Sequence, residues 1–150
     1  MIIKRVDSTN TDFKNLVKHL DADLAERDGD DHAFYHQFNK IDMLKNCVVA
    51  YFDDVAVACG AFKPFPEEEE VVEIKRMYTN PQYRKKGLAS ATLIELEQWA
   101  KELGYKKCAL ETGTKQPEAI ALYEKSGYSK IPNYGQYIGI ENSVCFEKAL

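Results

Sequence analysis

The sequence is poor in the features that mark several protein classes. Its 150 residues include only four cysteines, and no two of them form a C-x-x-C pair. All four lie in separate apolar, strand-like runs: Cys47, Cys59, Cys108 and Cys145. This placement predicts reduced core residues and neither a disulfide framework nor a zinc site. The longest apolar runs, residues 47–52 and 55–62, are too short to cross a membrane, and the N-terminus lacks a secretory signal pattern. We therefore expect a cytoplasmic protein.

An excess of positive charge is also missing. The 20 Lys and Arg residues face 24 Asp and Glu residues, which gives a formal net charge of −4. Such a chain lacks the electrostatic field of a protein that coats nucleic acid. With 45% hydrophobic and 29% charged residues, it has the composition of an ordinary globular domain. Its length predicts a single domain over residues 1–150.

Hydrophobic periodicity predicts a mixed α/β fold. The expected strands are, by residue number, 2–6, 47–52, 55–62, 71–79, 107–111, 128–131 and 144–148. The expected helices are one that carries Phe13, Leu16, Val17 and Leu20, a short one over 32–44, and two more that begin near Gly87 and at Pro117. The helix near Gly87 has a predicted buried stripe of Ala89, Thr92, Leu96, Trp99 and Leu103. This order predicts a sheet that is antiparallel in its first half and has helical crossovers in its second.

Three consecutive cations precede the helix that begins near Gly87. Arg84, Lys85 and Lys86 lie where the helix dipole is already positive, so a bound anion would relieve their repulsion. Gly87 would let the backbone approach such an anion closely. The alternative is a solvated basic turn. The stretch matches neither the P-loop pattern nor G-x-G-x-x-G.

Two motifs resemble those of one known family. Arg84-x-x-Gly87-x-Ala89 is similar to the R/Q-x-x-G-x-G/A loop of the GNAT superfamily, the acetyl-CoA-dependent N-acetyltransferases. Residues 119–128, A-I-A-L-Y-E-K-S-G-Y, resemble that family's A-I-x-L-Y-E-K-x-G-F helix. The chain departs from the family at Lys86, where a glycine is frequent, and at Gln116-Pro117, where the family often has asparagine.

The resemblance implies a fold and a cofactor site. The fold would be a mostly antiparallel, twisted sheet of six to seven strands flanked by about four helices. Strand 71–79 would splay from strand 108–111 and admit acetyl-CoA as co-substrate, with no metal. The residues that would hold it are Met77, Tyr78, Thr79, Arg84, Lys85, Lys86, Gly87, Leu88, Ala89, Ser90 and Gln116.

Acetyl transfer to an amine needs a base, an oxyanion donor and an acid. Glu73 occupies a position that resembles the family's general-base glutamate, and Tyr123 resembles the tyrosine that points at the thioester sulfur. Glu73 could instead be a strand residue that pairs with Lys75, or be dispensable if water suffices. Without the motif, Tyr123 would be a core aromatic residue.

The acceptor side holds charges of both signs. An acidic group opposes a single cation, Arg27, and comprises Asp21, Asp23, Glu26, Asp28, Asp30 and Asp31. This rim, with Tyr134 and Tyr137, suggests a small-molecule cationic amine, although a solvated helix end explains it equally well. Lys75 and Arg76 favour a different acceptor, because these two cations could bind an acceptor carboxylate.

The sequence leaves other functions open. A non-catalytic acyl-CoA-binding module and a protein or peptide N-acetyltransferase are both compatible with these motifs. His32 and His36 lie four residues apart, but they lack a third ligand, so we expect no metal site. We expect no nucleic-acid or membrane partner, while homodimers are common in the family.

Overall fold

A computed structural model describes residues 1–28 and 44–150. Seven strands of this part form one sheet in the order β1-β2-β3-β4-β5-β7-β6. The strands are β1 (Ile2–Val6), β2 (Asn46–Phe52), β3 (Val55–Pro64), β4 (Val71–Thr79), β5 (Lys107–Gly113), β6 (Ser129–Ile131) and β7 (Ser143–Ala149). The α-helices are α1 (Thr11–Asp28), α3 (Leu88–Glu102) and α4 (Pro117–Lys125), and two 3₁₀ turns are η2 (Pro81–Tyr83) and η3 (Gly135–Tyr137).

The predicted fold class is confirmed. Neighbouring strands pair in antiparallel fashion except β4 and β5, which are parallel and joined by the α3 crossover. Three of the roughly four expected α-helices lie in the described part of the chain. The short helix expected over 32–44 falls almost entirely outside the described residues.

The β2–β3 hairpin turns at the two residues between the expected strands 47–52 and 55–62. Asp53 and Asp54 have φ angles of 51° and 65°. Positive φ at both central residues is the geometry of a type I′ turn, whose twist matches that of the flanking strands. Aspartate tolerates this left-handed conformation better than most side chains do.

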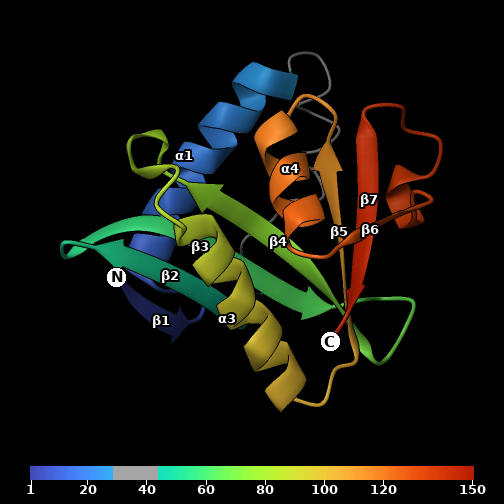
Figure 1. Ribbon diagram of the computed structural model, residues 1–150, viewed down its shortest axis with the longest axis horizontal. Coiled ribbons are helices and arrows are strands. Elements are labelled where there is room, and N and C mark those ends of the chain that lie inside the picture. Colours follow the sequence, from blue (N-terminus) through green and yellow to red (C-terminus); the bar gives the residue numbers. More distant parts are fainter. Residues whose placement is uncertain (29–43) are drawn as a thin grey trace.

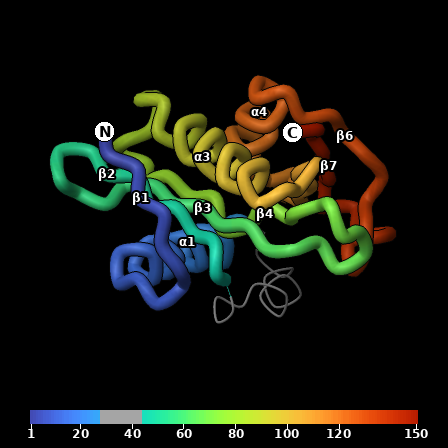
Figure 2. Tube along the Cα trace, turned by 90° about the horizontal axis from the view of Figure 1, so that it is seen from below, coloured from blue at the N-terminus to red at the C-terminus, as the bar shows by residue number. Residues whose placement is uncertain are grey.

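Helices cover both faces of the sheet. Helices α3 and α4 lie on one face, and α1 lies on the other (Figures 1 and 2). Side chains of β2 point alternately to the two faces of the sheet and so contribute to both cores. Val48 packs with Leu96 beneath α3, whereas Cys47 and Val49 pack with Phe13 of α1. All four cysteines are buried and unbridged.

The buried face of α3 differs from the predicted stripe. Thr92 and Leu96 are fully buried as expected, but Leu103 is 55% exposed, while Leu93 and Ala100 are buried. The reason is that α3 ends at Glu102, so Leu103 is the C-cap residue and no longer follows the helical spacing.

Of the described helices, none is long and apolar enough to span a membrane.

The two faces of α3 give a stability prediction. Leu96→Ala should lower the free energy of unfolding by about 2–5 kcal/mol, because it leaves a cavity in the core. Ile94→Ala, on the same helix at a position 63% exposed, should change it by less than about 0.5 kcal/mol. Urea denaturation of both variants measures the difference. Equal losses would contradict the packing.

Candidate active site

The sheet splits between its two parallel strands. β4 and β5 pair only from Val71↔Lys107 to Glu73↔Ala109. From there the strands diverge, with α4 lying in front of the split (Figure 1). The later residues of both strands, together with α1, α3 and α4, line a cleft of about 650 Å³. The splay implied by the family resemblance is therefore present.

A β-bulge bends β4 where it borders the cleft. The register places Gly60 of β3 opposite both Arg76 and Met77. Arg76 has a φ of 61°, and such a two-against-one arrangement disrupts the regular ladder. A Cβ at Gly60 would lie 2.5 Å from the Met77 sulfur, so glycine permits the close approach of the bulged strand. The regular ladder is therefore interrupted at Arg76 and Met77, and both residues line the cleft.

Most of the predicted site residues meet in this cleft. Those that line it are Arg76, Met77, Tyr78, Thr79, Arg84, Lys85, Gly87, Leu88, Ala89, Ser90, Gln116 and Tyr123. Four others do not line it: Glu73, Lys86, Tyr134 and Tyr137. The ammonium of Lys86 instead lies over the ring of Phe52, 5.3 Å from its centroid.

One end of the cleft is cationic and rich in backbone donors. Gly87, with a φ of 78°, is the N-cap of α3 and, within the described structure, no side chain caps this helix start. The amides of its first turn have no intrahelical acceptor and belong to residues that border the cleft. Arg84 and Lys85 line the same end, so an anion there would meet both side-chain cations and the positive helix terminus.

Tyr123 lies inside the cleft on α4. Its side chain is buried, and its ring packs edge-to-face on Tyr128 at a centroid distance of 5.8 Å. Burial, together with the negative charge of Glu111, raises the pKa of Tyr123 above its usual range. The phenol therefore remains protonated at neutral pH and has a proton to donate in a hydrogen bond.

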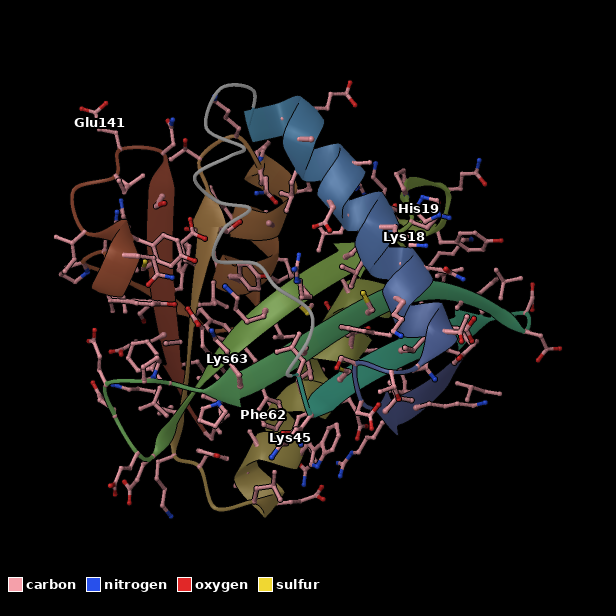
Figure 3. The ribbon with its side chains drawn as sticks, turned by 180° about the vertical axis from the view of Figure 1, so that it is seen from behind. Lys18, His19, Lys45, Phe62, Lys63 and Glu141 are labelled. Atoms are coloured by element: carbon pink, nitrogen blue, oxygen red, sulfur yellow. The ribbon has the colours of Figure 1, made fainter. Side chains whose placement is uncertain are left out.

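Glu73 lies on the α1 face of the sheet in a polar cluster. The carboxylate is 3% exposed and accepts a hydrogen bond of 2.7 Å from the Tyr134 hydroxyl. The Lys63 ammonium lies 3.8 Å from its other oxygen. Figure 3 shows where Lys63 lies on β3. Tyr137 packs edge-to-face on Tyr134 at 5.8 Å. Burial and then the Glu73 charge raise the pKa of Tyr134, so its hydroxyl stays a donor to Glu73.

Two acidic residues of α1, Asp21 and Asp23, form ion pairs with arginines. Asp21 accepts a 2.9 Å hydrogen bond from Arg76, whose side chain is only 3% exposed. Arg27 pairs with Asp23 at 3.3 Å and also with Glu118 at the start of α4. Glu26 is exposed.

The remaining acidic and histidine candidates are not assessed by the structure. Asp28 ends α1. Asp30, Asp31, His32 and His36 lie outside the described residues. Among the residues that are described, no His, Cys, Asp and Glu group of three or more could hold a metal.

Several cleft residues escape the sequence motifs. The cleft is also lined by three residues of β5, Glu111, Thr112 and Gly113. Helix α1 adds Leu20 and Leu24 to the lining. The signal for Glu111 was an acidic residue in an otherwise apolar strand. No local pattern indicates that α1 reaches the cleft, because this depends on packing between distant segments.

The Arg76–Asp21 pair gives a second prediction. Asp21→Asn leaves the buried Arg76 guanidinium without its carboxylate and should lower the free energy of unfolding by about 1–3 kcal/mol. Glu26→Gln, an exposed change of the same charge on the same helix, should cost less than about 0.5 kcal/mol. Urea denaturation tests both, and an unaffected Asp21→Asn protein would show that the pair contributes nothing.

Comparison with known proteins agrees with this geometry. The model of the acetyltransferase (GNAT) family matches residues 13–128. An uncharacterized N-acetyltransferase of Escherichia coli K12, YjgM, is 38% identical over 84 residues, which span 56% of this chain and 50% of that protein. The match thus covers about half the length of that relative.

Solved structures share the whole fold. A Klebsiella pneumoniae protein assigned as an acyl-CoA N-acyltransferase superposes with a TM-score of 0.81 at 29% identity, covering 99% of this chain and 97% of that one. The Salmonella typhimurium protein yncA, assigned as an acetyltransferase and solved with its cofactor acetyl-CoA, has a TM-score of 0.69 at 16% identity, covering 100% and 94% of the two chains. The family match, the fold and the split sheet together show that this chain belongs to the acetyltransferase (GNAT) family.

Proposed function

We propose that the protein is an N-acetyltransferase that moves an acetyl group from acetyl-CoA to a primary amine of a small molecule. The observation that carries this proposal is the cleft between β4 and β5, which joins a cationic, donor-rich end to a buried tyrosine. Family membership and the acetyl-CoA found in the Salmonella protein support the same cofactor.

The cationic end fits the phosphates of coenzyme A. Arg84 and Lys85 offer positive charge, and the first turn of α3 offers backbone N–H groups. The space around Gly87 is open, since a Cβ there would meet no atom within 4 Å among the described residues. The β4 bulge would bring backbone groups near Met77 and Tyr78 to the acyl arm. Acetyl-CoA supplies the activated thioester.

The transfer forms a C–N bond and breaks a C–S bond. The amine nitrogen attacks the thioester carbonyl carbon and loses a proton, and the departing thiolate gains one. Tyr123 would hydrogen-bond to the departing sulfur and pass that proton to it, because it lines the cleft and stays protonated. Glu73 would accept the amine's proton only through an intervening water, since its carboxylate accepts a bond from Tyr134 and does not line the cleft.

Loss of the acetyl-CoA thioester, followed by absorbance, tests the function. A panel of amines, amino acids and a lysine peptide should give acceptor-dependent loss with small amines, against a blank without acceptor. Turnover of the peptide alone would favour a protein N-acetyltransferase. Acetyl-CoA binding without turnover of any acceptor would favour a non-catalytic binder.

Tyr123→Phe should lower kcat about 100-fold while leaving acetyl-CoA affinity unchanged, because only the phenolic hydroxyl is removed and the ring remains. Tyr128→Phe removes a second buried hydroxyl, bonded to Glu97 and outside the cleft, and should keep kcat. Since the Tyr123 pKa is raised, this residue should cause no alkaline loss of activity below about pH 10. An active Tyr123→Phe enzyme would remove Tyr123 from the chemistry.

Coenzyme A affinity, measured by calorimetry, tests the cationic end. Arg84→Gln should weaken binding at least about tenfold, because a charged hydrogen-bond donor is lost. Lys86→Gln should weaken it less than about threefold, because this ammonium lies over Phe52. Lys130→Gln, on exposed β6, is the charge-matched control. A larger loss at Lys86 than at Arg84 would contradict the assignment.

A further inference from the structure

Lys75 is a cation that the proposed chemistry does not use. It lies on β4 within the cleft lining, beyond the last β4–β5 pair. Within residues 1–28 and 44–150 no ion pair or hydrogen bond is found for its side chain. Burial lowers its pKa, and the Glu73 and Glu111 carboxylates oppose this only in part. A partly buried ammonium without a direct partner is costly, and a bound anion would relieve that cost.

The neighbouring charges are already engaged. Arg76 holds Asp21, and Glu73 holds the Tyr134 hydroxyl with Lys63 nearby. Asp23 pairs with Arg27. Two acidic residues of α1, Asp21 and Asp23, are therefore paired with arginines, which reduces their attraction for a purely cationic amine. Apart from Arg84 and Lys85 at the phosphate-binding end, Lys75 is a cation of the cleft lining that can meet a ligand.

The side of the sheet on which Lys75 lies separates it from the phosphate-binding end. Lys75 pairs with Ala61, whose side chain packs in the α1-face core. Ile74 faces the opposite core, beneath α3, and Met77 packs against that same core. Lys75 thus projects toward the α1 face, whereas the cationic end belongs to the start of α3. A ligand group that meets Lys75 would approach from the α1 side, away from the coenzyme A phosphates.

We infer that Lys75 binds a carboxylate of the acceptor, so that the substrates are amines that also carry a carboxylate, such as amino acids. This inference rests on the proposed function, because it assigns the acceptor of the same cleft. The amine end would lie toward the thioester, and the carboxylate would lie on the α1 side. Uncharged amines and polyamines would be poor acceptors, because they leave Lys75 buried without an anion.

The kinetic test compares each of the twenty L-amino acids with its carboxamide, which differs only in the charged group. For the best acceptor, kcat/KM should be at least about tenfold higher for the carboxylate. Lys75→Gln should bring the ratio close to one by raising KM for the carboxylate form, with kcat little changed. Lys75→Arg should restore most of the preference. Lys18→Gln, an exposed change on α1 (Figure 3), should leave the ratio unaltered.

A binding test gives an answer without turnover. N-acetylated amino acids and their carboxamides are titrated by calorimetry into the protein with coenzyme A, and the carboxylate form should bind at least about tenfold tighter. Equal affinity of the two forms, including no detectable binding of either, would overturn the inference even if acetyl transfer occurs. A similar loss for both forms in Lys75→Gln would also overturn it. Carboxylate preference without transfer to any acceptor would overturn the proposed enzyme function alone.

Discussion

The candidate site depends on the point at which β4 and β5 stop pairing. Three residue pairs join the two parallel strands at their beginnings, and after Glu73↔Ala109 the strands no longer pair. Two constraints enforce this arrangement. The register at the start is fixed by Val72 and Cys108, which are buried in the α3-side core. The bulge at Arg76 and Met77 then interrupts the regular course of β4. Gly60 of β3, the other strand beside β4, leaves room for this bulge.

Splitting a sheet leaves strand-edge amides and carbonyls that would normally pair with each other. Buried groups of this kind need a partner, and a ligand in the cleft can provide it. The same split lets helices from both faces contribute side chains to one cavity: Leu20 comes from α1, Leu88 from α3 and Tyr123 from α4. The binding and reacting groups are therefore brought together by the defect in the sheet, while the flanking strands keep them fixed.

Local sequence patterns predicted most of the helices and strands well. The fold class, the Asp53-Asp54 hairpin and the loop before α3 depend on residues close together in the chain, where turn chemistry and periodicity act. The direction of Lys86 did not follow from its motif, since it depends on Phe52 in a distant hairpin. The stripe on α3 failed at Leu103 because the helix ended one residue earlier.

The partners of charged residues were the least predictable. Glu73 and Tyr134 are 61 positions apart, and nothing local to either residue indicates their hydrogen bond. Likewise the acidic residues of α1 suggest a free rim in the sequence, whereas the structure pairs Asp21 and Asp23 with arginines. Such contacts arise from packing of the complete sheet, so charge patterns alone overstate how many groups are available to a ligand.

The bridge from Arg27 to Glu118 has a consequence for how the cleft forms. It connects α1 and α4, which cover opposite faces of the sheet, through residues 91 positions apart in the chain. A contact of such long separation carries a large loop-closure entropy until the intervening strands are in place. We therefore expect the α1–α4 side of the cleft to close late in folding, after β1–β4 and α3 have assembled. In this order the chain builds one half of its sheet first and completes the cleft between β4 and β5 last.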